Sequence, residues 1–146
     1  EGDGVTADLV SSYQITGKSQ VSYQKVNGPD ISKYGVLKLD LSSNEVLGIA
    51  EKPSFENAPS NLAAIGRYVL SPEIFDVLRN QPPGSGGEIQ LADAIDKMAK
   101  NDGVEMVPLT GKRFDCGSME GYVEGFSYVA STRFLEKSEV VYGKVG

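Results

Sequence analysis

Hydrophobic residues along the chain recur with two different periods, one typical of helices and one typical of strands. Apolar positions three and four residues apart predict helices, and alternating or β-branched runs bounded by turn residues predict strands. The predicted helices are residues 6–13, a helix that starts at Ser71-Pro72-Glu73, a helix that carries Leu91, Ala94, Ile95 and Met98, and a last helix from about Ser118. The predicted strands are residues 19–26, 34–41, 46–50, 62–70, 104–109 and 113–115.

The order of these elements predicts the fold class. Strands 34–41 and 46–50 flank a short polar loop and predict a hairpin, and the turn at residues 110–112 predicts a second hairpin from 104–109 to 113–115. Helices and strands are mixed without a strict βαβ alternation. The pattern therefore indicates an α/β fold in which a mixed β-sheet is flanked by helices.

The length of 146 residues is typical of one domain with its own core. Residues 1–5 are polar and glycine-rich, so we expect a frayed end or a remnant of an expression vector there. We expect the folded domain to cover residues 6–135 and a tail to cover 136–146.

Charge and composition exclude several classes of function. The net charge is −6 and the 14 lysines and arginines are scattered, which argues against a nucleic-acid surface. No apolar run reaches the roughly 20 residues of a membrane span. A single cysteine, Cys116, and the lack of a secretory leader predict a cytoplasmic protein. The chain has no histidine, so its chemistry must use carboxylates, lysines, backbone amides or an oxygen-liganded cation.

Asp115 is the first candidate site residue. It follows a predicted strand and precedes Gly117 and Ser118, the expected N-cap of the last helix. A carboxylate in that place points into the crevice above the sheet, where α/β folds bind ligands. It suits Mg²⁺, which shares carboxylate, water and phosphate oxygens. The alternative is that Asp115 only caps the helix.

Glu51 and Lys52 form the second candidate, at a strand end just before Pro53. Lys52 could bind a phosphate and Glu51 could accept hydrogen bonds from sugar hydroxyls. Neighbouring side chains on a strand point to opposite sides, unless the proline bends the chain. The alternative is a solvated strand end that carries two opposite charges.

Glycines mark further places where a ligand could approach the backbone. Gly35 begins a predicted strand and Gly66 lies inside another. Residues 84–87 resemble a phosphate loop superficially, but they lack the P-loop lysine and the G-x-G-x-x-G pattern, which favours a simple connector. Glu88 follows them, and a carboxylate on a mobile loop can close over a sugar.

Together and in this order, the segments resemble the bacterial UTP–glucose-1-phosphate uridylyltransferases over about Asp8 to Arg133. The most specific stretches are Glu51 through Ala63 and Gln81 through Ile95. The other segments that carry the resemblance are Lys33–Val36, Asn61–Tyr68, Gly87–Leu91 and Phe114–Ser118.

The resemblance implies the C-terminal half of a Rossmann-like sugar nucleotidyltransferase fold. It also implies the condensation of UTP with glucose 1-phosphate to UDP-glucose and pyrophosphate, assisted by Mg²⁺. Lys52 would contact the phosphate of the sugar phosphate, and Asp115 would be one of two aspartates that hold the metal. The residues implied near the sugar are Gly35, Glu51, Gly66, Arg67 and Glu88.

One part of the family's pattern has no counterpart here. Family members begin with a strand and a glycine-rich loop that binds the nucleotide, and no G-x-G-T-R-like run occurs in this sequence. We therefore expect a chain that binds glucose 1-phosphate or UDP-glucose but is inactive alone. We also expect a homo-oligomer, because a missing half would leave a sheet edge and an apolar face uncovered. A non-catalytic binding module and a self-associating interaction domain remain as alternatives.

Overall fold

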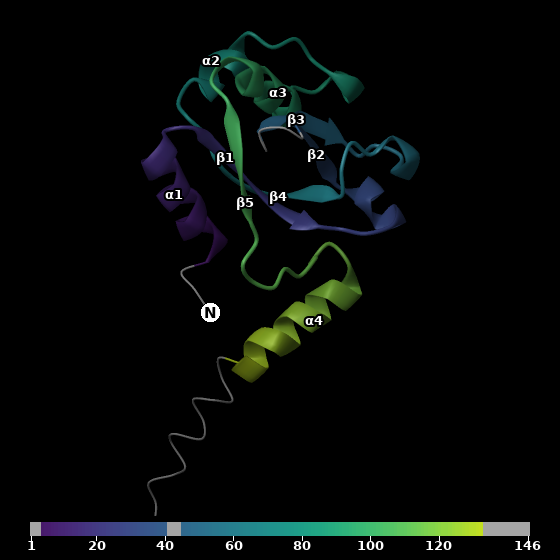
Figure 1. Ribbon diagram of the computed structural model, residues 1–146. Helices are drawn as coiled ribbons and strands as arrows, with labels where there is room; N and C mark the ends of the chain where they lie inside the picture. The colour runs from purple at the N-terminus through teal and green to yellow at the C-terminus, as the bar shows by residue number, and fades with distance from the viewer. Residues whose placement is uncertain (1–3, 41–44, 133–146) are drawn as a thin grey trace, which may run out of the picture. The chain divides into compact units, whose positions relative to one another are not determined.

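The computed structural model describes residues 4–40 and 45–132, so the expectations for residues 1–3 and the tail 136–146 lie outside it. Figure 1 shows the elements in their order along the chain. These are α1 (Val5–Thr16), β1 (Ser19–Lys25), β2 (Gly35–Leu39), β3 (Val46–Glu51), β4 (Leu62–Val69), α2 (Ile74–Arg79), α3 (Leu91–Asn101), β5 (Val104–Pro108) and α4 (Met119–Ala130). They belong to two compact units, the first of which ends at Gly111 while the second begins at Lys112.

In the first unit the strands form a closed ring in the order β1-β4-β2-β3-β5, with β5 beside β1 again. β1 and β5 are parallel, and the other neighbours are antiparallel. The prediction of a mixed sheet flanked by helices is confirmed. The expectation of an uncovered sheet edge is wrong for the described strands, because each of them has a neighbour on both sides.

The hydrophobic core lies between the sheet and α3. The apolar face of α3 follows the helical period, and Ala94, Ile95 and Met98 are each at most 1% exposed. Ile74 of α2 joins the same core. Burial of each larger side chain of this kind contributes about 1.5–3 kcal/mol. The sheet residues of this core are Val21, Leu37, Val46, Ile49, Leu62 and Val104.

The prediction of a strand at residues 113–115, and with it the second hairpin, is wrong. β5 already pairs with β1 and β3, so no position beside it is left for another strand. In the second unit Phe114 instead packs on α4. A Cβ on Gly125 would lie 3.1 Å from the Phe114 Cβ, and the rings of Phe114 and Tyr128 are 5.3 Å apart. Packing on a helix therefore replaces strand pairing.

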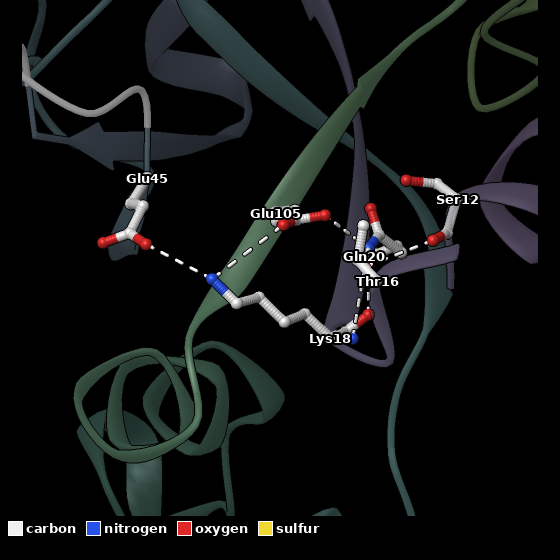
Figure 2. A network of polar contacts seen from close by, with 6 residues as sticks. All are labelled: Ser12, Thr16, Lys18, Gln20, Glu45 and Glu105. Carbon is white, nitrogen blue, oxygen red and sulfur yellow. Dashed lines mark hydrogen bonds and ion pairs between the residues drawn. The ribbon is translucent and has the colours of Figure 1, made fainter. Parts of the chain in front are cut away.

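A polar network ties the start of β1 to β3 and β5 (Figure 2). The Lys18 ammonium lies 3.3 Å from Glu45 and 3.9 Å from Glu105. The fully buried Gln20 donates from Nε2 to Glu105 Oε2 at 3.0 Å and to Thr16 Oγ1 at 3.1 Å. Buried amides of this kind favour one pairing register, because any slip would leave them without partners.

No helix within the described ranges is both long and apolar enough for a membrane span.

Candidate functional site

Glu51 and Lys52 lie at the end of β3, where the chain turns away from the sheet. Glu51 pairs with Gly35 across the β2–β3 hairpin, and the Lys52 N–H donates to the Tyr34 carbonyl at 3.1 Å. Lys52 has a φ of 43°, a left-handed conformation that is uncommon for a residue with a side chain. This turn, just before Pro53, places the Lys52 ammonium 3.9 Å from the Glu51 carboxylate. The two side chains therefore lie on the same side.

Gly35 gives the Glu51 carboxylate its room. A Cβ at Gly35 would lie 3.2 Å from Glu51 Oε2 and 2.9 Å from Ile49 Cγ2. Any side chain there would have to displace one of them. The glycine singled out in the sequence thus lies directly beside Glu51, and its absent side chain sets the position of that carboxylate.

A hollow of about 350 Å³ opens at this end of the sheet, and Glu51 and Lys52 line it together with Glu88, Gln90 and Asp93. Three of the residues predicted from sequence therefore share one site. Gln90 and Asp93 were missed. Gln90 is the N-cap position of α3 and Asp93 lies in its first turn. No local pattern marked them, because the predicted helix does not by itself show that its N-terminus reaches the end of β3.

Glu88 is held by a tight turn. The Gly84 N–H donates to the Glu88 carbonyl at 2.9 Å, and the Gly87 N–H donates to the Gly84 carbonyl at 3.1 Å. Gly86 and Gly87 both have positive φ, which glycine adopts without strain. A Cβ on Gly84 would lie 2.8 Å from the Asp93 carboxylate, so this loop and α3 approach closely. The segment expected to be a simple connector is thus a closed loop that carries Glu88 to the hollow.

The charges of the hollow define what it can bind. Three carboxylates and one ammonium face it, so its net charge is negative. Carboxylates accept hydrogen bonds from hydroxyl groups, and an ammonium donates to phosphate oxygens. The arrangement suits a polyhydroxylated molecule with one anionic group, and Lys52 is the only cation among the lining residues.

Gly66 and Arg67 are not among the residues that line this hollow. They lie in an irregularity of β4, where the pairing with β1 shifts register between Val21 and Tyr23. The Ser22 hydroxyl donates to the Arg67 carbonyl at 2.7 Å and holds this bulge. Bulges bend a strand and re-aim its side chains, often near functional sites.

Tyr68 of β4 does not line the hollow, but its side chain is close enough to Glu51 to respond to its charge. Burial raises the pKa of its phenol above the ordinary value of 10.0, and the nearby charge of Glu51 raises that pKa further. The Glu51 charge thus reaches β4 as well as β2.

This coupling predicts a pH dependence. Because the folded state keeps the Tyr68 proton at a pH where the unfolded chain has lost it, the free energy of unfolding should fall as pH rises above 10.0 toward the raised pKa. Glu51→Gln should lower the pKa of Tyr68 part of the way, since burial remains. An ultraviolet titration of tyrosinate absorbance, from which the curve of Tyr68→Phe is subtracted, measures the pKa of Tyr68 in the wild type and in Glu51→Gln. An identical Tyr68 titration in wild type and Glu51→Gln contradicts the assignment.

Asp115 lies in the second unit. Its Oδ1 accepts from the Gly117 N–H at 3.1 Å and its Oδ2 lies 3.3 Å from Arg113. The cap of α4 is Ser118, whose hydroxyl accepts from the Gly121 N–H at 3.1 Å. Ser118, and not Asp115, is therefore the N-cap of α4, and the Asp115 carboxylate holds the turn that precedes the helix. Its side chain remains 59% exposed.

Magnesium needs oxygen ligands, and the described residues contain no group of three acidic, cysteine or histidine side chains that could hold a metal. Mg²⁺ is usually held by one or two carboxylates together with water and substrate phosphate. A single exposed carboxylate such as Asp115 fits one position of such a site.

The fold and the sequence together define a class. The nucleotidyl transferase family matches residues 7–132, so the chain belongs to that family. The chain is 44% identical over 131 residues to a UTP–glucose-1-phosphate uridylyltransferase of Pseudomonas aeruginosa, covering 88% of this chain and 47% of that one. It is 41% identical over 126 residues to the enzyme of the same name from Escherichia coli K12, covering 82% and 41%.

Solved structures agree with these relatives. A UDP-glucose pyrophosphorylase complexed with UDP-glucose is 40% identical with a TM-score of 0.78, covering 86% of this chain and 49% of that one. The UDP-glucose pyrophosphorylase of Acinetobacter baumannii is 32% identical with a TM-score of 0.80, covering 97% and 50%. The recognition made from the sequence motifs is thus confirmed. The chain spans about half the length of the relatives it matches.

Proposed function

We propose that this chain forms the sugar-phosphate side of a UTP–glucose-1-phosphate uridylyltransferase. The observation that supports it best is the shared hollow, in which Glu51 at the end of β3 and Lys52 just after it meet Glu88 from the loop before α3. Glu88 is far from Glu51 and Lys52 in the sequence, yet all three side chains line the same hollow. Their chemistry matches a sugar that carries one phosphate.

In this proposal Lys52 binds the phosphate of glucose 1-phosphate, and Glu51 and Glu88 accept hydrogen bonds from glucose hydroxyls. The backbone at Gly35 and Gly66 approaches the sugar, and Arg67 lies nearby as a further contact. The negative hollow disfavours a second anionic group on the sugar, because only one ammonium lines it. Selectivity for a monophosphate follows.

The reaction we propose is an in-line displacement at the α-phosphorus of UTP. A phosphate oxygen of glucose 1-phosphate forms the new P–O bond, the bond to the β-phosphate breaks, and pyrophosphate leaves. No covalent intermediate on the protein is needed, so the residues act by positioning and electrostatics. Asp115 would supply one carboxylate to Mg²⁺, whose chemistry is to neutralise charge on the phosphates.

The chain alone is proposed to bind without turnover, because its sequence has no glycine-rich nucleotide loop. We also propose a cytoplasmic homo-oligomer. Self-association is the second candidate function, and α4 is the observation that favours it. Met119, Tyr122 and Phe126 on this helix are 74%, 57% and 67% exposed, an apolar surface that a lone soluble helix rarely shows.

Calorimetric titration tests the first proposal. Glucose 1-phosphate should bind saturably and more tightly than glucose or inorganic phosphate, because the hollow holds both parts of the molecule. Glucose 6-phosphate, with the phosphate on another carbon, is the matched control and should bind more weakly. No UDP-glucose should form when UTP is added. Absence of glucose 1-phosphate binding, with light scattering showing an oligomer, would sink this proposal and favour self-association.

A further inference from the structure

Gln81 is a buried amide at the point where the chain leaves α2. It is only 6% exposed, and a buried amide is costly unless its polar atoms have partners. Its Nε2 donates to the Gln90 carbonyl at 2.8 Å, and its Oε1 accepts from the Lys97 ammonium at 3.3 Å. One side chain therefore joins the beginning of the loop, its end, and the middle of α3.

The bond to Gln90 closes the loop that carries the sugar-facing residues. Gln90 is the N-cap position of α3, and its carbonyl also accepts from the Ala94 N–H at 3.3 Å. Gln81 thus fills the second acceptor position of the carbonyl at which the helix begins. The smaller turn from Gly84 to Glu88 lies inside this closure and is held by backbone hydrogen bonds of its own.

The two prolines that follow Gln81 make the loop more dependent on the Gln81 side chain. Pro82 and Pro83 have no N–H to donate, so this part of the loop cannot be fixed by its own amides. Ile89, on the other side of the turn, is 53% exposed and provides little packing. The bridge from Gln81 to Gln90 is therefore the polar contact that fixes both ends of the loop, and Glu88 and Gln90 face the hollow from it.

We propose that Gln81 is a positioning residue that sets the place of Glu88 and Gln90 in the sugar half of the hollow. Gln81 does not line the hollow, and Lys52 directly follows β3, outside this loop. Loss of the bridge should therefore weaken recognition of the sugar and leave recognition of the phosphate intact. The expected change in ligand affinity rests on the proposed function. The expected change in hydrogen exchange of the loop rests on the loop geometry alone.

The test variant is Gln81→Met, which keeps the length and shape of the side chain and removes the amide. Hydrogen exchange of the Gly84 and Gly87 amides should become at least about fivefold faster, since a hydrogen bond is worth about 1 kcal/mol. Affinity for glucose 1-phosphate should fall by about fivefold, while affinity for inorganic phosphate stays unchanged. Lys97→Met, a milder variant at an exposed residue, should show a smaller change in the same direction.

Gln20→Met is the matched control, because it also removes a buried amide but lies on β1. It should lower thermal stability without changing exchange in the loop or the ratio of the two affinities. Unchanged exchange at Gly84 and Gly87 in a folded Gln81→Met or Lys97→Met chain overturns the inference, whatever the ligand data. If the wild type binds no glucose 1-phosphate, the proposed function is wrong. Faster hydrogen exchange at Gly84 and Gly87 in Gln81→Met would still support the role of Gln81 in holding the loop.

Discussion

Replacing Lys52 with alanine is expected to weaken glucose 1-phosphate binding on the order of ten- to a hundredfold. The ammonium is the only cation that lines the hollow, and a hydrogen bond between charged groups is worth about 1.5–3 kcal/mol. Without Lys52 no cation would line the hollow, and the phosphate would face three carboxylates and the Gln90 amide. Calorimetric titration of glucose 1-phosphate against wild type and Lys52→Ala measures the loss.

Two further variants show what the side chain contributes. Lys33→Ala removes another exposed lysine, which pairs with Asp30 and does not line the hollow, and it should leave affinity unchanged. Lys52→Gly should lose as much affinity as Lys52→Ala but be more stable than it by about 1 kcal/mol, because glycine accepts the left-handed backbone. Wild-type affinity in a folded Lys52→Ala chain is the result that contradicts the assigned role.

Local sequence rules were sufficient for the elements that carry the site. Two apolar runs on either side of a short polar loop predicted β2 and β3, and Pro53 predicted that strand pairing stops just before it, as β3 does at Glu51. The left-handed turn at Lys52 could not be predicted, since a lysine carries no preference for it. That turn, and not the strand itself, brings the two charged side chains to one side.

The rest depended on contacts between distant segments. Ring closure places β5 beside β1, a parallel pairing that no local pattern specifies. It also explains why a strand at 113–115 was predicted wrongly: its residue types permit a strand, but β5 has no free side. Gln90 and Asp93 were missed for the same reason, because only the fold shows that the N-terminus of α3 reaches the end of β3.

The largest effect on stability is expected for Gly48→Ala. Gly48 lies on β3 with a φ of 147°, and a Cβ there would collide with the Asp96 carboxylate of α3. That carboxylate accepts from the Ile49 N–H at 2.5 Å and from the Lys38 ammonium at 2.7 Å. A methyl group would displace it and break both bonds, so the free energy of unfolding should fall by about 3–5 kcal/mol, as chemical denaturation measures.

Gly66→Ala separates the steric effect from backbone strain. Gly66 also has a positive φ, of 72°, but nothing lies within 4 Å of its would-be Cβ, so this variant should cost only about 1 kcal/mol. Asp96→Ala provides the decisive background, because removal of the carboxylate removes the clash. Gly48→Ala should then cost only the strain of its φ, about 1–3 kcal/mol. If it costs as much there as in the wild type, Asp96 is not what Gly48 accommodates.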